Sequence, residues 1–141
     1  DIKIKIGSAF PDDDFDKTTL EERGLHLLSG LPRSVTLTSG EIREAMAETL
    51  SKIVEAVKRT LERTPPELAA DIVDRGIMLA GGGALVRGIN DLLSDETGIF
   101  THIAENPLLC VVNGCGEVLD DFKKLKRVVD TPEFIRNAIR D

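Results

Sequence analysis

Three consecutive glycines, Gly81 to Gly83, divide a short apolar run from an amphipathic one, and this feature constrains the fold more than any other. Residues 77–80 before them are four apolar residues next to glycines, the pattern of a buried strand. After them, apolar residues recur at helical spacing: Leu85, Val86, Ile89, Leu92 and Leu93. A strand that turns directly into a helix predicts an α/β fold for this half of the chain.

A second strand and helix are predicted downstream. Residues 99–104 have the pattern of a strand, and Asn106 with Pro107 form a good helix start, with Asn as N-cap and Pro in the first turn. The apolar residues that continue this helix are Leu108, Leu109, Val111, Val112, Val118 and Leu119. Cys110 and Cys115 lie in this run, at a spacing that matches neither a redox nor a zinc motif, and packed, reduced thiols are expected.

Upstream, the pattern predicts a hairpin followed by a long helix. Residues 20–28 and 34–38 are two short strands joined by a turn-rich connection. Thr38 and Glu41 have the capping-box spacing that begins a helix. The apolar stripe of that helix is Ile42, Met46, Leu50, Ile53, Val57 and Leu61, which is typical of core packing.

Two shorter segments complete the order. Thr64 and Pro65 repeat the capping pattern and begin a second helix, which ends at Gly76. Residues 2–6 alternate Ile with Lys, which fits a strand of period two. The end of a helix with Gly7 as its C-cap would also fit. The chain opens without Met and inside an element, which is typical of part of a longer protein.

Composition and charge exclude several functions. The net charge is −7, which argues against the basic surface that a nucleic-acid-binding protein needs. No apolar run reaches the roughly 18 residues of a membrane-spanning helix. The acidic loop at residues 11–16 lacks the spacing of a calcium site, and a solvated loop is the better interpretation.

The glycine turn has two interpretations on pattern alone. Glycines let a ligand approach the backbone closely, and the amides at the start of a helix favour an anion, so a nucleotide contact is plausible. The pattern is neither a P-loop nor a G-x-G-x-x-G fingerprint, because no Lys-Ser or Lys-Thr follows and Gly88 falls at the wrong offset. A tight strand-to-helix turn without a ligand remains the alternative.

Longer stretches carry a specific resemblance. The segment TPPELAADIVDRGIMLAGGGALVRGINDLLSDETGI, followed by HIAENPLLCVVNGCGEVL, closely resembles the C-terminal part of the MreB family of bacterial actin homologues. The stretches IKIKIGSAFP and RGLHLLSGLPRSVTLTSGEIREAM resemble the same family in the same order. The resemblance ends near Leu119, and it favours a helix for residues 2–6.

The resemblance implies a partial actin-like (RNase H-like) ATPase fold of class α/β. Residues 1–75 would form the upper small subdomain of the second lobe, and residues 76–120 the later part of the larger subdomain, with the nucleotide turn. Residues 121–141 would be a basic, amphipathic tail. Two interpretations of this tail remain open, a membrane-surface or partner-binding segment and a terminal helix that docks on its own domain.

The resemblance also implies the site residues. The adenosine-binding turn of the family falls on Gly81, Gly82, Gly83, Ala84 and Leu85. The second contact is a charged helix with a Glu-x-x-Lys pattern, whose lysine is matched by Lys3 and whose preceding positions are matched by Asp1 and Ile2. The glutamate of that pattern would precede the first residue. The resemblance assigns no catalytic and no metal-binding residue to this chain.

The family function implied is a filament-forming, ATP-binding cytoskeletal protein that determines rod cell shape by organising cell-wall elongation. ATP and magnesium would bind between two lobes, and this chain alone is expected to bind ATP weakly or not at all and not to hydrolyse it. The implied partners are further copies of the protein, cell-wall elongation proteins and the membrane surface, with filaments in the cytoplasm at the membrane and no nucleic acid.

Two alternatives remain open. The chain would act as a non-enzymatic assembly module if residues 20–38 and their neighbours make the longitudinal filament contacts that the upper subdomain makes in the family. Another ATPase of the actin superfamily, such as a sugar kinase or a chaperone, would share the glycine turn but lacks the run of matches from Thr64 to Leu119.

Overall fold

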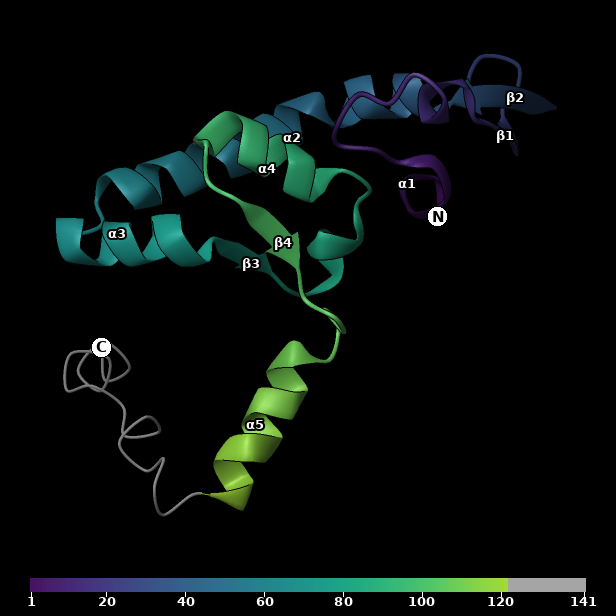
Figure 1. Cartoon of the computed structure of the whole chain (residues 1–141). Helices are drawn as coiled ribbons and strands as arrows, with labels where there is room; N and C mark the ends of the chain where they lie inside the picture. Colours follow the sequence, from purple (N-terminus) through teal and green to yellow (C-terminus); the bar gives the residue numbers. More distant parts are fainter. Residues whose placement is uncertain (122–141) are drawn as a thin grey trace, which may run out of the picture.

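The computed structural model of the 141-residue chain describes residues 1–121. Its helices and strands follow the predicted order (Figure 1). The basic cluster at residues 123–127 and the predicted apolar face at residues 134–139 lie outside the described residues. In chain order the elements are α1 (Ile2–Ile6), β1 (Thr19–Leu25), β2 (Pro32–Thr38), α2 (Ser39–Glu62), α3 (Pro66–Arg75), β3 (Ile77–Leu79), α4 (Ile89–Thr97), β4 (Thr101–Ile103) and α5 (Cys110–Asp120).

The hairpin is confirmed, but its first strand is shorter than predicted. Strands β1 and β2 pair antiparallel from Thr19 opposite Thr38 to Leu25 opposite Pro32. The connection closes on itself, because the His26 N–H donates to the Leu31 carbonyl at 2.9 Å. Residues 26–28 therefore belong to the connection and not to β1.

Helix α2 begins with the predicted capping box. The Thr38 hydroxyl accepts a hydrogen bond from the Glu41 N–H at 3.2 Å, and the Glu41 carboxylate accepts one from the Thr38 N–H at 2.8 Å. The bonds that Thr38 donates lower the pKa of Glu41, because they favour the ionised carboxylate. Local chemistry thus sets the start of this helix.

Three other predicted helix boundaries are wrong or only partly right. Helix α3 begins at Pro66 with Pro65 as N-cap, because the Thr64 hydroxyl donates to the carbonyl of Thr60 instead of capping. Helix α1 is confirmed as a helix, but its C-cap glycine is in an extended and not a left-handed conformation. Helix α5 begins at Cys110, not near residue 106.

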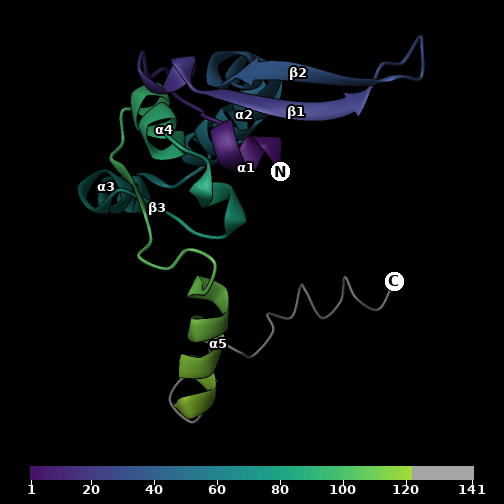
Figure 2. The same cartoon turned by 90° about the vertical axis from the view of Figure 1, so that its right-hand side faces the viewer.

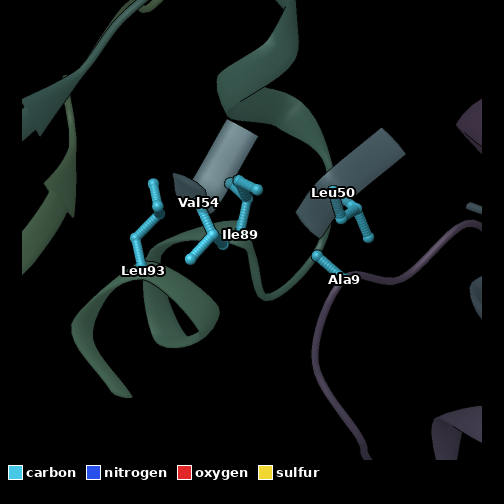
Figure 3. Packing of buried hydrophobic residues seen from close by; sticks show 5 residues of the cluster. All are labelled: Ala9, Leu50, Val54, Ile89 and Leu93. Atoms are coloured by element: carbon cyan, nitrogen blue, oxygen red, sulfur yellow. The ribbon is translucent and has the colours of Figure 1, made fainter. Parts of the chain in front are cut away.

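The core joins the two predicted subdomains. The buried side chains come from α2, from α4 and from the segment after α1 and converge as in Figure 3: Ala9, Leu50, Val54, Ile89 and Leu93. Strands β3 and β4 are parallel, and α4 is the crossover between them. Val54 is buried, whereas Ile53 of the predicted stripe is 44% exposed. The core thus includes residues from both sides of the predicted subdomain boundary at residue 75. That boundary stays a prediction.

Helix α5 extends away from the other elements in both views (Figures 1 and 2). None of its residues is buried, and Val111, Val112 and Leu119 are 60% to 74% exposed. Cys115 is also exposed, so the expectation of a packed thiol is wrong for this residue. Within residues 1–121, no helix combines the length and the apolar character needed to span a bilayer.

Candidate functional site

The glycine turn is fixed by a backbone hydrogen bond to the segment before α5. Gly81 has φ of 80°, a left-handed value that glycine adopts without strain. Its N–H donates to the carbonyl of Pro107 at 2.6 Å, and residues Gly82–Leu85 then form a 3-10 turn. Pro107 is thus committed to the glycine turn, which explains why α5 begins later than predicted.

The outer side of this turn is unobstructed. A Cβ added to Gly81 or Gly83 would meet no atom within 4 Å. Among the described residues, the N–H groups of Gly82 and Gly83 have no hydrogen-bond acceptor. Packing within residues 1–121 does not therefore require glycine at position 83, and the bare amides are available to a ligand.

The prediction that the glycines lead directly into a helix is wrong. Helix α4 begins at Ile89, after a left-handed Gly88 with φ of 71°. The segment between the 3-10 turn and α4 lies against the N-terminal part of the chain, because the Ala9 N–H donates to the Arg87 carbonyl at 2.7 Å. The amides available at the glycines therefore belong to the 3-10 turn, Gly82–Leu85, and not to the first turn of α4.

A clamp around Arg87 fixes this segment. Its guanidinium bonds the Asp12 carboxylate at 2.9 Å and lies 4.2 Å from the centre of the Phe15 ring. Asp12 also accepts the Phe15 N–H at 3.0 Å, and this bond, followed by the one from Arg87, lowers the pKa of Asp12. The acidic loop thus has a structural role, because Asp12 holds Arg87 in place. Within the described part of the chain, no group of three or more His, Cys, Asp or Glu could hold a metal ion.

A pocket of about 500 Å³ brings the two predicted contacts together. Lys3 lines it from α1, while Gly83 and Ala84 line it from the glycine turn. Its volume lies within the range of small-molecule sites. The other lining residues come mostly from α2, β3 and α4: Ala45, Met46, Thr49, Leu50, Ile53, Leu79, Ala80, Val86, Ile89 and Leu93.

The lining combines an apolar wall with one cation. Lys3 is the charged residue in the described lining, and it is exposed at the edge. An apolar wall accepts a flat aromatic ring, while a lysine and free amides favour an anion. The arrangement suits a ligand with both parts.

The remaining predicted site residues do not line this pocket. The Asp1 carbonyl accepts the Ile4 and Lys5 N–H groups at 3.1 Å, so this residue is the N-cap of α1. Ile2 is half-buried in the same helix. A Cβ added to Gly82 would lie 3.7 Å from Leu108, and Leu85 is 58% exposed.

Sequence reasoning missed the part of the pocket that α2 supplies. Met46, Leu50 and Ile53 belong to the stripe that was interpreted as core alone, and Thr49 lies between them. Their helical spacing predicts an apolar face but not the space in front of it. No signal in the spacing distinguishes a pocket wall from a packed core.

Comparison with known proteins identifies relatives along most of the chain. The family model described as MreB/Mbl protein matches residues 1–127. The chain is 47% identical over 127 residues to the cell shape-determining protein Mbl of Bacillus subtilis (strain 168), covering 90% of this chain and 38% of that protein. It is 51% identical over 119 residues to the cell shape-determining protein MreB of Escherichia coli (strain K12), covering 84% of this chain and 34% of that protein.

Solved structures agree with the sequence comparison. The structure of MreB5 of Spiroplasma citri bound to ADP is similar with a TM-score of 0.80 and 35% identity, over 92% of this chain and 38% of that one. MreB5 of the same organism bound to AMPPNP gives a TM-score of 0.81 and 36% identity, over 89% and 37% of the two chains. The predicted partial actin-like α/β fold is thereby confirmed.

The chain spans little more than a third of the length of these relatives. The matched residues nevertheless include α1, the glycine turn and the whole described lining of the pocket. The family model, the sequence identity and the fold similarity each cover most of this chain. The chain belongs to the MreB/Mbl family.

Proposed function

We propose that this chain supplies the adenosine side of an ATP-binding cleft in a bacterial actin-like protein. The pocket that joins Lys3 to Gly83 and Ala84 carries the proposal. In it the adenine ring lies against the apolar wall from α2, and the turn amides and Lys3 face the ribose and phosphates. We assign Asp1, Ile2, Gly81, Gly82 and Leu85 to the surroundings of this contact.

Two observations support a nucleotide as the ligand. The similar MreB5 structures are described as bound to ADP and to AMPPNP. The N–H groups of Gly82 and Gly83 have no acceptor among the described residues, and a Cβ on Gly83 would meet no atom within 4 Å, which suits a ligand that approaches the backbone. A bound nucleotide would thus satisfy amides that the described residues leave without acceptors.

Hydrolysis requires groups that the described residues do not provide. No described cluster of carboxylates could hold magnesium, so the residues here do not fit a metal site. Magnesium and the attacking water would belong to the part of the relatives that this chain does not span. We expect the chain alone to bind ATP weakly and not to hydrolyse it.

The relatives are named cell shape-determining proteins, and we propose the same role for the protein to which this chain contributes. In this role ATP-bound subunits associate into filaments at the cytoplasmic membrane and organise cell-wall elongation proteins. We assign residues 1–75 to the upper subdomain and residues 76–120, which include the nucleotide turn, to the larger subdomain. Nucleic acid is not a partner of this acidic chain.

A chimera tests the proposal. The segment of E. coli MreB that aligns with this chain is replaced by it, and ATP binding and cell shape are measured. Gly83→Val should abolish ATP binding and rod shape, because the side chain fills the space beside the turn. Gly24→Val is the matched control, because a Cβ there also meets nothing within 4 Å. Normal ATP binding by the Gly83→Val chimera would refute the nucleotide site.

An assembly module is the second candidate, and the exposed apolar side of α5 favours it. Sedimentation of the purified chain separates the two functions. Concentration-dependent association that ATP does not alter supports a module, whereas a persistent monomer supports an incomplete ATPase half.

A further inference from the structure

A second groove lies between α2 and α4, on a different side of α2 from the pocket that Lys3 and Gly83 line. We call it the outer groove. Its volume is about 480 Å³, and Leu50 of α2 lines both sites. Two of its residues on α2 are small, so another segment can approach the helix closely there. The small and apolar residues that form its floor are Ala47, Leu50, Ser51 and Val54 of α2 and Leu92 of α4.

The rim of the outer groove carries two carboxylates without an ion-pair partner. Arg43 and Lys58 also line the groove, but each already forms an ion pair within the chain. Glu44 and Glu55 form no hydrogen bond or ion pair with another described residue. They are eleven residues apart on α2, which is close to three turns, so both face the same side about 16 Å apart. A ligand that reaches both carboxylates is therefore long and basic, as a peptide segment is.

Residues 122–141 of this chain have the charge that the outer groove lacks. They contain six Lys or Arg and three Asp or Glu, whereas residues 1–121 contain 12 and 22. The two carboxylates at the rim therefore attract this tail and repel the acidic body of a second copy. A segment of the same chain also has an effective concentration of about a millimolar, which a separate partner does not.

The tail has an apolar part that suits the floor of the groove. Four apolar residues recur at helical spacing near the end of the chain. Arg136 and Arg140 are four residues apart, so at the same spacing they lie together on one side of this face. In the outer groove both unpaired carboxylates likewise lie on one rim, that of α2. The residues of the predicted apolar face are Phe134, Ile135, Ala138 and Ile139.

We propose that the last ten residues, 132–141, dock in the outer groove of the same chain. Their apolar face covers the floor, and Arg136 and Arg140 form ion pairs with Glu44 and Glu55. The segment follows residue 127, where the match to the family model ends, so membership of the family does not imply this contact. The contact also goes beyond the proposed nucleotide site, because it uses a different side of α2 and needs no ATP.

The tail is long enough to reach the groove. Figures 1 and 2 show β3 between α5 and the layer that α2 and α4 form. The eleven residues of α5 are about 16 Å long, and packed helices lie about 8–10 Å apart. The thirteen residues from Asp121 to Phe134 span up to about 45 Å when extended. The tail can therefore return along α5, pass the sheet and reach α2.

Paramagnetic relaxation in the whole 141-residue chain tests the proposal in the absence of nucleotide. Both native cysteines are replaced by Ser, and Asn137→Cys carries a nitroxide label. The backbone amide signals of Ala47, Ser51 and Leu92 should broaden, because these residues line the outer groove. A label on Ser29→Cys in the connection of the hairpin is the control, and it should leave the same signals unchanged.

An exchange of charges tests the two ion pairs. Arg136→Glu with Arg140→Glu should reduce the broadening, because the equilibrium constant for docking falls by up to about fivefold for each exposed ion pair lost. Adding Glu44→Arg with Glu55→Arg should restore it, since the charges are again opposite. Added salt should weaken docking of the unaltered tail, because salt screens exposed charges.

A matched control separates this rescue from a general change of charge. Glu67→Arg with Asp71→Arg alters two exposed carboxylates of α3 that do not line the outer groove. Combined with the same two tail substitutions, these changes should not restore the broadening. The amide spectrum of each variant without the label shows whether the fold is retained.

Three results would overturn the proposal. The first is a label on the tail that broadens no signal of the outer groove. The second is broadening that passes from labelled chains to isotope-labelled chains in a mixture of the two, which assigns the groove to the tail of a second copy. The third is unchanged broadening after Arg136→Glu with Arg140→Glu. None of these results bears on ATP binding, because the samples contain no nucleotide.

Discussion

At the scale of the residue, Gly88 shows how a backbone position orients the site. Both Gly88 and Gly98 have left-handed φ values, 71° and 69°. A Cβ on Gly88 would lie 2.8 Å from the Cβ of Phe10, whereas a Cβ on Gly98 would meet nothing within 4 Å. Gly88 therefore allows the segment after the glycine turn to lie against the N-terminal segment.

Substitution of these glycines separates strain from crowding. Gly98→Ala should lower the free energy of unfolding by about 1 to 2 kcal/mol, the cost of a left-handed alanine. Gly88→Ala should cost roughly 1 kcal/mol or more beyond that, because Phe10 must move. Urea denaturation measures both. Equal losses for the two variants would show that the contact with Phe10 is unimportant.

The clamp around Arg87 predicts that the stability of the fold depends on pH. The pKa of Asp12 in the folded chain lies below its ordinary value of 3.8, so its ionised form stabilises the fold above that pH and the contribution is lost as pH falls further. Asp12→Asn should lower the melting temperature at pH 7, and its difference from the wild type should narrow below pH 3.8. Asp13→Asn is the matched exposed control. A constant difference across this range would contradict the role of the charge.

At the scale of the element, the capping box of α2 is the clearest local signal. Thr38→Ala should lower the free energy of unfolding by about 1 kcal/mol, because the Glu41 N–H loses its acceptor. Thr60→Ala within the same helix should be neutral or stabilising, since alanine has the higher helix propensity. Chemical denaturation measures the free energy of unfolding of both variants. An equal loss in the two would contradict a stabilising role for the Thr38 cap.

The elements that the sequence predicts well are those whose boundaries depend on nearby residues. The hairpin and the start of α2 depend on neighbouring residues, so their patterns predict them. The starts of α4 and α5 depend on contacts far along the chain, from Ala9 to Arg87 and from Gly81 to Pro107. Spacing within a window cannot indicate such contacts, and both starts were predicted too early.

At the scale of the molecule, the resemblance predicted the two sides of the pocket, Lys3 and the glycine turn. It could not predict the wall from α2, because a stripe of apolar residues has the same spacing whether it is covered or lines a pocket. Helix α5 was predicted as a helix, but its exposure depends on which elements stand beside it. Such information lies in packing between distant segments and not in any one of them.

The nucleotide site is tested most sharply by titrating the isotope-labelled chain with ATP and following its backbone amide NMR signals. We predict weak, fast-exchange shifts at millimolar ATP that are confined to Lys3, Gly82, Gly83, Ala84 and the pocket side of α2. No phosphate should be released. Shifts confined to other regions, or no shifts at all at these concentrations, would contradict the assignment of this pocket as the adenosine side of the cleft.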